Sequence, residues 1–580
     1  MSIPLNQYWR LLSRYLAAQR LLVIGLFALI LLGTGLQVLS PLLIGRFIDE
    51  AIGNADQGTL TTMALLFIGA AILAQVVNVV STWASETIGW TATNDLRADL
   101  AVHCLGLDMS FHKTRTPGEM ITRLDGDIDA LSLFFSQLVL QVLGALLLLT
   151  GILIMLTLEE WRIGIVMSIF AVVVLWLVMR LRDFALPAWL RVREKQAAFY
   201  GFLSEQLSGR ADIRGNGART YSMNQLRHHY AEWLPIDIRS VLKGYGTISA
   251  VMHLSFMCAQ LIALFFSLYL WREGSLTIGS VYLVFHYTEM MRRPIDRIRE
   301  QINQLQAAGA SIVRVQGLLD IETQIKDEGK TPLPDGALSV ALRDVSFGYE
   351  PGAPVLNDIS FNLEPGEVLG LLGRTGGGKT TIGRLLVRLY DIDDGSIELG
   401  GVPLRETPLA TLRDRVAVVS QDVQIFEGTV RENLTFFDAS VPDSKLLAAL
   451  DGLGMREWLE RLPGGLHAPV AANRLSAGEA QLLACGRAFL RDPGLVILDE
   501  ATSRLDPATQ RLIDGAMGRL LDGRSAILIA HRLATIDRAD KVAVLEDGRI
   551  VEYGRYAMLL ADPASRFYQL HRLDVEAQPA

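Results

Sequence analysis

The first half of the chain contains six long apolar stretches without Asp, Glu, Lys or Arg. Each approaches or exceeds the roughly 20 residues that a helix needs to cross the hydrocarbon core of a bilayer, and the fourth and sixth can extend past their flanking charges. A stretch of this length and composition is typical of a membrane-spanning helix. The sequence therefore predicts six spans, at residues 21–45, 58–85, 130–158, 163–179, 244–271 and 274–288.

The connections between these stretches differ in length and charge. Those after the first, third and fifth stretches are short and acidic, whereas those after the second and fourth are long, and the one after the fourth is rich in Arg and Lys. Because cytoplasmic loops carry the excess of Lys and Arg, both termini and the long loops are expected in the cytoplasm. No cleavable signal peptide is expected, since the first apolar run is too long for a signal core. The chain is thus predicted to be a multi-pass protein of the inner (plasma) membrane.

In the two long loops, at residues 91–108 and 190–200, apolar residues recur with helical spacing and no helix breaker interrupts them. The membrane helices are therefore expected to continue into the cytoplasm. Turn signals mark the loop tips at residues 111–119 and 208–217. We interpret these tips as short helices that dock onto the cytoplasmic domain, although solvated hairpin loops would show the same polarity.

Three ionisable side chains fall within or beside the predicted spans: His253, His286 and Glu289. An ionisable group is costly at membrane depth, so such residues mark candidate polar sites. His286 and Glu289 are three residues apart and share a helix face, where they could line a polar cavity or form a proton-sensitive pair. Hydrogen bonding to a neighbouring helix is the alternative for the histidines. Pro294 is expected to kink the sixth helix.

The second half contains an apolar strand that runs into a glycine-rich loop and then into a helix, at residues 369–386. The spacing Gly-x-x-x-x-Gly-Lys-Thr is the phosphate-binding loop pattern in its required strand–loop–helix context. Its glycines let backbone N–H groups point at phosphate oxygens, and the helix adds the positive end of its dipole. Lys379 is expected to reach the β and γ phosphates, and Thr380 to ligate Mg²⁺. The residues expected to hold ATP here are Gly373, Arg374, Thr375, Gly376, Gly377, Gly378, Lys379, Thr380 and Thr381.

Two further apolar strands end in residues suited to phosphate chemistry. Residues 495–498 lead into Asp499, expected to hold the Mg²⁺ shell, and Glu500, expected to orient or deprotonate the attacking water. Residues 525–530 lead into His531, expected to hydrogen-bond the γ-phosphate. Together with the phosphate loop, these strand ends predict a site for ATP hydrolysis.

Two single residues extend this prediction. Gln421 ends a buried strand at residues 415–422, and its amide is expected to bind Mg²⁺ and water. Tyr349 lies about thirty residues before Lys379, where an aromatic face can stack on the purine ring, a contact of about 1–3 kcal/mol. Taken alone, a tyrosine at this position is more often part of core or turn packing.

With these motifs the chain resembles the ATP-binding cassette (ABC) transporters, and among them the exporter type in which six membrane helices precede one cassette. The resemblance covers nearly the full length. It implies an α-helical transmembrane domain followed by an α/β P-loop NTPase domain with antiparallel β and α-helical subdomains. The expected limits are a transmembrane domain at 1–320, a linker at 321–337, a cassette domain at 338–574 and a tail at 575–580.

The resemblance also assigns residues that act across a dimer interface. Residues 475–479 correspond to the family signature, in which Ser476 and Gly478 face the γ-phosphate of ATP held by the partner's phosphate loop. Residues 503–506, which end in Asp506, correspond to the D-loop. The chain thus resembles one half-transporter, whose partner is a second half-transporter, with two ATP sites at their interface.

The signature departs from the usual Leu-Ser-Gly-Gly-Gln at two positions, Ala477 and Glu479. A methyl at Ala477 restricts the backbone, and a carboxylate at Glu479 places negative charge near a polyphosphate. The acidic residue expected just before the signature is also missing between Ala468 and Arg474. An intact Glu500 and His531 beside an altered signature resembles one half of a heterodimeric exporter with unequal ATP sites. A heterodimer is favoured, and a homodimer with two weakened sites stays open.

The resemblance implies ATP-driven export of a small amphipathic substrate such as a lipid, drug or peptide. An ATP-binding receptor or regulatory subunit without its own transport is the rival interpretation, and import through the same fold would share every motif. The net charge of −8 argues against nucleic acid as a partner. Three dispersed cysteines support neither a disulfide frame nor a zinc site.

Overall fold

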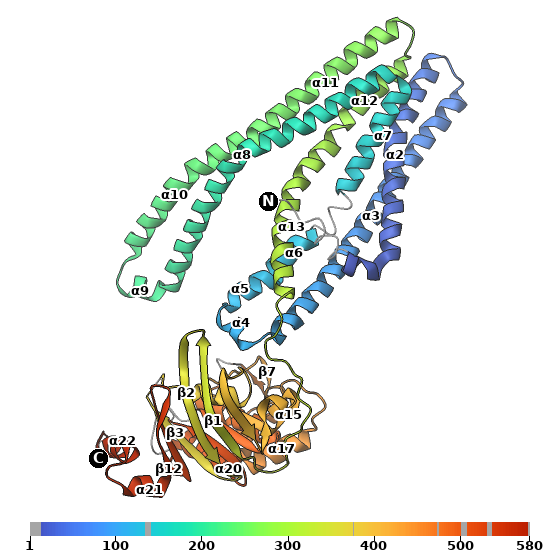
Figure 1. The fold of residues 1–580 in the computed structure, drawn as a ribbon. Coiled ribbons are helices and arrows are strands. Elements are labelled where there is room, and N and C mark those ends of the chain that lie inside the picture. The colour runs from blue at the N-terminus through green and yellow to red at the C-terminus, as the bar shows by residue number, and fades with distance from the viewer. Residues whose placement is uncertain are drawn as a thin grey trace. The chain divides into compact units, whose positions relative to one another are not determined.

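The computed structural model describes residues 13–133, 141–374, 376–471, 475–499, 507–530 and 536–577. The chain divides into two compact units, and Figure 1 labels many of their elements. The helical unit comprises Met1–Gly106 and Thr116–Ile321, and the mixed unit comprises Leu107–Arg115 and Glu322–Ala580. The residue limits expected for domains, linker and tail stay predictions.

The helical unit contains no strand among its described residues. Its longest helices are α2, α3, α8 and α13, and short turns of 3-10 or π type join several of the helices. The elements are η1 (Ala17–Gln19), α2 (Arg20–Ile52), α3 (Gln57–Gly106), α5 (Pro117–Ile121), η2 (Thr122–Gly126), α6 (Asp127–Leu133), α7 (Gly144–Glu159), α8 (Trp161–Ser208), α9 (Arg210–Gly215), α10 (Arg219–Val241), η4 (Leu242–Gly246), α11 (Thr247–Arg272), α12 (Ile278–Met290) and α13 (Arg292–Leu319).

Within the described residues, five helices are long and apolar enough to cross a bilayer, and each overlaps one of the first five predicted spans. These helices are Ser13–Ile52, Gln57–Gly106, Gln141–Glu159, Trp161–Leu181 and Arg219–Arg272. The sixth predicted span corresponds to α12, which has 13 residues.

The helix of the sixth span is interrupted at Met291, between α12 and α13. Pro294 has no N–H group for the carbonyl of Met290, and its ring crowds the preceding turn. The helix is therefore interrupted next to the proline where the sequence predicted a kink, and the bend itself stays a prediction.

Close packing and polar contacts join α12 to α2. A Cβ atom on Gly279 would lie 2.1 Å from the carbonyl oxygen of Gly45, so the two backbones touch directly. Asp49 accepts a hydrogen bond from the N–H of Gly279 at 2.7 Å, and Tyr287 donates its hydroxyl to the carbonyl of Val38 at 2.8 Å. These contacts fix the start and middle of α12 against one neighbour.

The mixed unit is built around a six-stranded sheet of order β12-β11-β3-β10-β9-β6. All neighbouring pairs in this sheet are parallel except β11 with β12. Strands β9 and β10 are near-continuous apolar runs that are buried on both faces, which is typical of parallel sheets. The strands are β3 (Val368–Gly373), β6 (Val416–Val419), β9 (Leu495–Asp499), β10 (Ser525–Ile529), β11 (Lys541–Glu546) and β12 (Arg549–Arg555).

Two smaller sheets complete the strands of the mixed unit. A four-stranded antiparallel sheet has the order β2-β1-β4-β5, and β7 pairs with β8. These strands are β1 (Val340–Glu350), β2 (Ala353–Leu363), β4 (Asp394–Leu399), β5 (Val402–Pro403), β7 (Gly428–Thr429) and β8 (Pro469–Val470).

The helices of the mixed unit cover these sheets and form a separate helical region between β6 and β9. That region contains α16 (Val430–Thr435), α17 (Asp443–Gly452), α18 (Arg456–Arg461), η6 (Gly465–His467) and α19 (Ala477–Leu490). The other helices of the mixed unit are α4 (Met109–Lys113), α14 (Lys379–Leu386), η5 (Leu404–Glu406), α15 (Leu409–Arg415), α20 (Pro507–Leu521), α21 (Tyr556–Ala561) and α22 (Arg566–Ala577). Parallel sheet, antiparallel sheet and helical region match the expected α/β architecture with its two subdomains.

The tips of both long loops are short helices, as predicted. The tip of the first loop forms α4, and its residues belong to the same compact unit as the nucleotide domain. The tip of the second loop forms α9, which belongs to the helical unit. Docking of the second tip onto the cytoplasmic domain stays a prediction.

Candidate nucleotide-binding site

The predicted site residues follow strands that run in the same direction. Ile529 of β10 is in register with Leu371 of β3 and with Asp499 of β9, and β6 runs parallel to β9. The carboxyl ends of these strands therefore meet at one edge of the sheet, where α/β proteins bind ligands. This edge brings together the phosphate loop, Asp499 and the segment that carries Gln421. Thr375, Glu500, Asp506 and His531 lie outside the described residues.

The phosphate loop depends on two glycines with unusual backbone geometry. Gly373 has φ +150°, and a Cβ there would lie 2.1 Å from the carbonyl oxygen of Leu545. Gly378 has φ +99° in the left-handed region and ends the loop as the N-cap of α14. Only glycine fits both positions without displacing its neighbours. The loop can thus wind tightly between β3 and α14.

Lys379 is fixed inside this loop. Its side chain is 3% exposed, and its ammonium donates hydrogen bonds to the carbonyls of Gly373 at 2.7 Å and Arg374 at 3.0 Å. The helix that follows packs closely on the sheet, since a Cβ on Gly383 would lie 3.3 Å from Ile497. The charge of Lys379 is therefore held at the centre of the loop, beside the N-terminus of α14.

The donor atoms near this edge suit a small, hard cation. Asp499 offers a carboxylate, Gln421 an amide oxygen and Thr380 a hydroxyl, and Mg²⁺ prefers such oxygen ligands. Thr380 and Gln421 are exposed, and Asp499 is half-buried. The described residues contain no group of three or more His, Cys, Asp or Glu placed to hold a metal by themselves. A cation at this edge would need oxygens of the nucleotide as further ligands.

A cavity of about 510 Å³ borders the phosphate loop. Its walls include Arg374 and Gly376 of the loop, the turn between β11 and β12, and Arg566, whose Nε donates to Glu546 at 2.8 Å. Cavities that bind small molecules have volumes of about 300–1,000 Å³. The cavity beside the loop is thus of a size that binds small molecules, and neither Tyr349 nor Asp499 lines it.

Tyr349 is half-buried and held on several sides. Its hydroxyl lies 3.1 Å from Oγ1 of Thr381 and accepts a hydrogen bond from Arg384 at 3.0 Å, both on α14. The rings of Phe347 and Tyr390 stand nearly perpendicular to it, each with a centroid distance of 5.1 Å. The packing role considered from the sequence is therefore present, and stacking on a base stays a prediction.

The tip of the first long loop contacts this tyrosine. The ammonium of Lys113 lies over the Tyr349 ring, 4.4 Å from its centroid. The same segment is anchored by Asp108, which accepts a hydrogen bond from the N–H of Gln324 at 2.5 Å, and by the buried Phe111. Sequence reasoning singled out this tip but missed Lys113 as a contact of the site.

The altered signature forms the start of helix α19. Ser476 is the N-cap: its hydroxyl accepts from the N–H of Glu479 at 3.3 Å, and its N–H donates back to the Glu479 carboxylate at 2.8 Å. This is a capping box. The Ser476 hydroxyl also donates to the same carboxylate at 2.9 Å, and Trp458 donates its Nε1–H at 3.3 Å. Glu479 thus stabilises the helix start with both of its oxygens.

The other signature residues keep a helical backbone. Ala477 is the first residue of α19 and is exposed, whereas Gly478 is buried. Alanine is the best helix former, so its methyl group agrees with the helical backbone at this position. The expected effects of Ala477 and Glu479 on ATP hydrolysis stay predictions.

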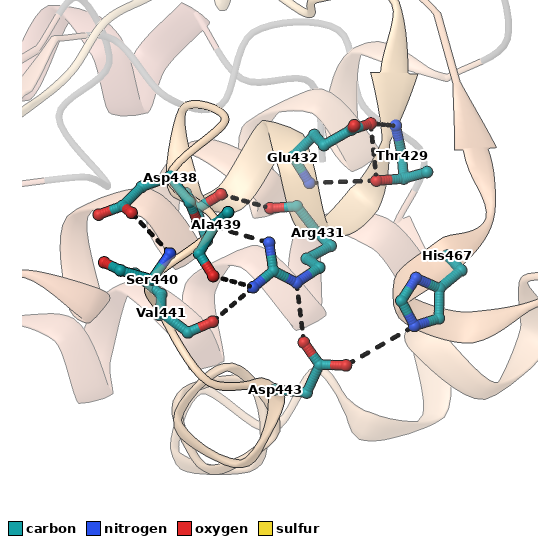
Figure 2. A network of polar contacts seen from close by, with 10 residues as sticks. Thr429, Arg431, Glu432, Asp438, Ala439, Ser440, Val441, Asp443 and His467 are labelled. Carbon is teal, nitrogen blue, oxygen red and sulfur yellow. Dashed lines mark hydrogen bonds and ion pairs between the residues drawn. The ribbon is translucent and has the colours of Figure 1, made fainter.

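A polar network fixes the segment between Gln421 and the signature (Figure 2). Thr429 and Glu432 form a capping box at the start of α16, and hydrogen bonds from the backbone and hydroxyl of Thr429 lower the pKa of Glu432. Arg431 donates to Asp443 at 2.8 Å, and His467 lies 3.6 Å from the other Asp443 oxygen. Arg431 also donates to the carbonyls of Asp438, Ala439 and Val441.

Helix α19 is tied to this network through Arg487. Its guanidinium donates to the carbonyl of Asn433 at 2.7 Å and to the carbonyl of Gln424 at 2.8 Å. Burial lowers the pKa of Arg487, although a guanidinium keeps its charge at neutral pH. The helical region between β6 and β9 is therefore one connected structure.

The ionisable residues of the predicted spans have separate partners. Glu289 of α12 accepts a hydrogen bond from Gln260 of α11, and the ring of His286 stacks on Tyr282 with centroids 5.5 Å apart. His253 contacts Arg292, with 2.5 Å between Nε2 and Nη2. Two polar pairs therefore connect α11 with the chain around Met291. The alternative of a hydrogen bond to a neighbouring helix is met by His253, whereas His286 stacks on a residue of its own helix.

Comparison with known proteins covers both halves of the chain. Residues 22–295 match the ABC transporter transmembrane region, and residues 356–503 match the ABC transporter family. An uncharacterized ABC transporter ATP-binding protein of Bacillus subtilis (strain 168), YknV, is 31% identical over 96% of this chain and 93% of its own length. An ATP-dependent lipid A-core flippase of Yersinia pestis is 30% identical over 98% of this chain and 97% of its own length.

The fold is also similar to a solved structure. A bacterial Atm1-family ABC exporter with ATP bound superimposes with a TM-score of 0.81 at 24% identity, covering 97% of this chain and 100% of that one. Since relatives with 30% identity or more span nearly the whole sequence, the protein belongs to the family of ABC transporters, membrane proteins that couple ATP hydrolysis to transport.

Proposed function

We propose that this chain is one half of a dimeric ATP-driven exporter whose substrate is a small amphipathic, lipid-like molecule. The observation that carries the proposal is the shared sheet edge, where the phosphate loop, Asp499 and the segment of Gln421 follow parallel strands. Lys379 is buried in that loop with its charge held at the start of α14. This arrangement suits the grip and hydrolysis of a triphosphate.

Each predicted residue has a role in this proposal. The loop residues and Lys379 hold the phosphates, and Tyr349 stacks on the adenine. Thr380, Gln421 and Asp499 hold Mg²⁺, which when bound offsets the negative charge of the phosphates. Glu500 takes the proton of the attacking water or orients it, and His531 hydrogen-bonds the γ-phosphate.

The second ATP-binding surface is the signature, which acts on ATP held by the partner half-transporter. Ser476 and Gly478 are assigned to the γ-phosphate there, and Asp506 to the D-loop contact. We favour a heterodimer, because the changes at Ala477 and Glu479 leave this chain with an altered signature beside a complete phosphate loop. A homodimer is the alternative arrangement.

Two observations support a lipid-like substrate. The relative from Yersinia pestis is named as a lipid A-core flippase. In this chain the pairs Gln260–Glu289 and His253–Arg292 place hydrogen-bonding groups among apolar helices. A molecule with a polar head and an apolar body would match such a surface. Localisation in the inner membrane, with the nucleotide domain in the cytoplasm, is part of the same proposal.

The central test is a Glu500→Gln variant of the purified transporter in sealed vesicles. We expect ATP binding within about twofold of the wild type and a loss of turnover of about 10²-fold or more, because the general base is removed. ATP-dependent movement of a labelled lipid should stop in the same vesicles. Near-normal hydrolysis by the variant would contradict the role of Glu500.

Direction is measured in vesicles of known orientation. Accumulation of the lipid on the side away from the nucleotide domain supports export, and movement toward the nucleotide domain supports import. An ATPase without any flux of several amphipathic probes would favour a regulatory subunit.

A further inference from the structure

We propose that Lys113 occupies the face of Tyr349 on which the adenine base stacks, so that the first long loop and the nucleotide compete for one aromatic surface. The proposal rests on the base-stacking role of Tyr349 given above. It adds a residue outside the nucleotide-binding motifs that tunes nucleotide affinity.

The position of the Tyr349 ring is fixed by its neighbours. Thr381 and Arg384 hold the hydroxyl on α14, only two and five residues after Lys379 of the phosphate loop. Phe347 and Tyr390 support the ring from perpendicular directions. The ring therefore keeps its orientation, because a rotation would break these contacts. A base that stacks on it must bind to the ring in this orientation.

A base can displace a neighbour of the Tyr349 ring only if that side chain is free to move. Phe347 is 4% exposed and belongs to the hydrophobic core around β1 and β3, and Tyr390 packs against the same core. Lys113 is exposed and ends in a flexible chain with a charged head. The ring face under its ammonium is therefore the face that a purine can take by displacing a neighbour.

The contact of Lys113 with the ring is favourable in the absence of a base. A cation over an aromatic face is attracted by the ring quadrupole, and this ammonium lies 4.4 Å from the centroid, within the range of the interaction. A base that stacks on Tyr349 must replace this attraction. The affinity of the site for ATP is thus lower than stacking alone would give.

The rest of the loop tip is anchored independently of Lys113. Asp108 accepts the hydrogen bond from Gln324, and Phe111 is buried while Arg115 covers its ring at 4.1 Å. Displacement of Lys113 therefore leaves the segment attached and changes only its contact with Tyr349. This makes Lys113 a positioning residue whose state follows the occupancy of the base site.

The test is a Lys113→Met variant, which keeps the length of the side chain and removes its charge. In the Glu500→Gln background, where ATP is not consumed, we expect the Kd for ATP to fall about two- to tenfold. The Kd for inorganic tripolyphosphate, which has no base, should stay unchanged. A Lys113→Arg variant keeps a cation over the ring and should bind ATP as the parent does.

A second pair of variants separates this inference from the proposed function. Tyr349→Ala should raise the Kd for ATP, Tyr349→Phe should keep it, and Lys113→Met should have no further effect in the Tyr349→Ala background. If Tyr349→Ala leaves the ATP affinity unchanged, the base-stacking role itself fails. Suppose instead that Tyr349→Ala raises the Kd for ATP. The competition by Lys113 is then overturned if Lys113→Met leaves the Kd for ATP unchanged or raises it, or if it changes the Kd for tripolyphosphate by the same factor.

Discussion

At the scale of single residues, Glu479 places a carboxylate at the start of α19, where the usual signature has the amide of a glutamine. Both of its carboxylate oxygens are used, one by the N–H and hydroxyl of Ser476 and the other by the indole of Trp458. The acidic side chain at the third helical position also complements the helix dipole. The Ser476 hydroxyl, expected to face a phosphate, donates its proton to this carboxylate instead.

The first prediction concerns Glu479→Gln. The amide oxygen can take the place of the carboxylate oxygen that accepts from both the N–H and the hydroxyl of Ser476, so the capping box is kept, while the amide nitrogen faces Trp458 and cannot accept from its indole N–H. A neutral amide oxygen holds the hydroxyl proton less strongly than a carboxylate does, so the proton is more readily given to a phosphate, and the added negative charge is gone. We expect ATP turnover of the purified dimer to rise about three- to tenfold, which corresponds to about 1 kcal/mol, measured as phosphate release under saturating ATP.

An Ala477→Gly variant is the matched control, because it restores the other signature residue without a change of charge. It should raise turnover less than Glu479→Gln. Unchanged or lower turnover in the glutamine variant, with the protein still folded, would mean that the carboxylate does not limit the signature.

At the scale of elements, a partly buried ion pair joins α6 to α13. Asp127 is 8% exposed and accepts from Arg314 Nε at 2.9 Å and from the Ser311 hydroxyl at 3.0 Å. Burial acts to raise the pKa of Asp127, but the hydrogen bonds from Arg314 and Ser311 outweigh it and hold the pKa below its ordinary value. Helices distant in sequence are thus connected by one charged contact.

The second prediction concerns Asp127→Asn. Its cost at neutral pH is expected to be about 1–2 kcal/mol, because a hydrogen-bonded carboxylate is lost while Arg314 stays half-exposed and solvated. A lowered folded pKa means that the stabilisation is complete above the ordinary carboxyl pKa and disappears as the pH falls through the lowered value. The Tm in detergent should drop by a few degrees at neutral pH, and the difference from wild type should vanish in acid.

Ser311→Ala provides the control for this pair. It removes one neutral donor and leaves Arg314, so its effect should be smaller and should keep the same dependence on pH. A difference between wild type and Asp127→Asn that persists below the lowered pKa would contradict the charged contact as the cause.

At the scale of the whole molecule, the proposed dimer needs a second half-transporter, which is either a different chain or a second copy of this one. The altered signature beside an unaltered phosphate loop favours a partner with a standard signature. We predict that this chain, tagged and purified from the membranes of its own host, retains a second, different half-transporter in equal amount. Mass spectrometry of the purified complex checks this.

The same chain produced without the partner provides the comparison. In that case we expect a dimer of identical chains, or none, with turnover at least several-fold below that of the purified pair. Equal activity of a single-chain preparation would support the homodimer, and with it two weakened ATP sites.

Local patterns in the sequence were sufficient for the main elements of the fold. The phosphate loop, the first five spans, the break before Pro294 and the strand that ends at Asp499 were all predicted. Each is determined by residues close together in the chain. An apolar run predicts a buried strand or a membrane span, glycines permit the tight turn of the phosphate loop, and a proline removes one N–H from a helix. Such effects operate within a few residues and leave a pattern that can be read directly.

The tertiary structure alone decided which distant side chains meet. Nothing in the sequence indicates that Lys113 lies on Tyr349, that Trp458 binds Glu479, or that Glu289 prefers Gln260 to His286. The physical reason is that these contacts depend on the positions of whole elements, and side-chain contacts between elements leave no periodic signal. The sequence by itself determined the resemblance to ABC transporters and the position of the phosphate loop. The packing of the elements decided which side chains contact that loop and its neighbours.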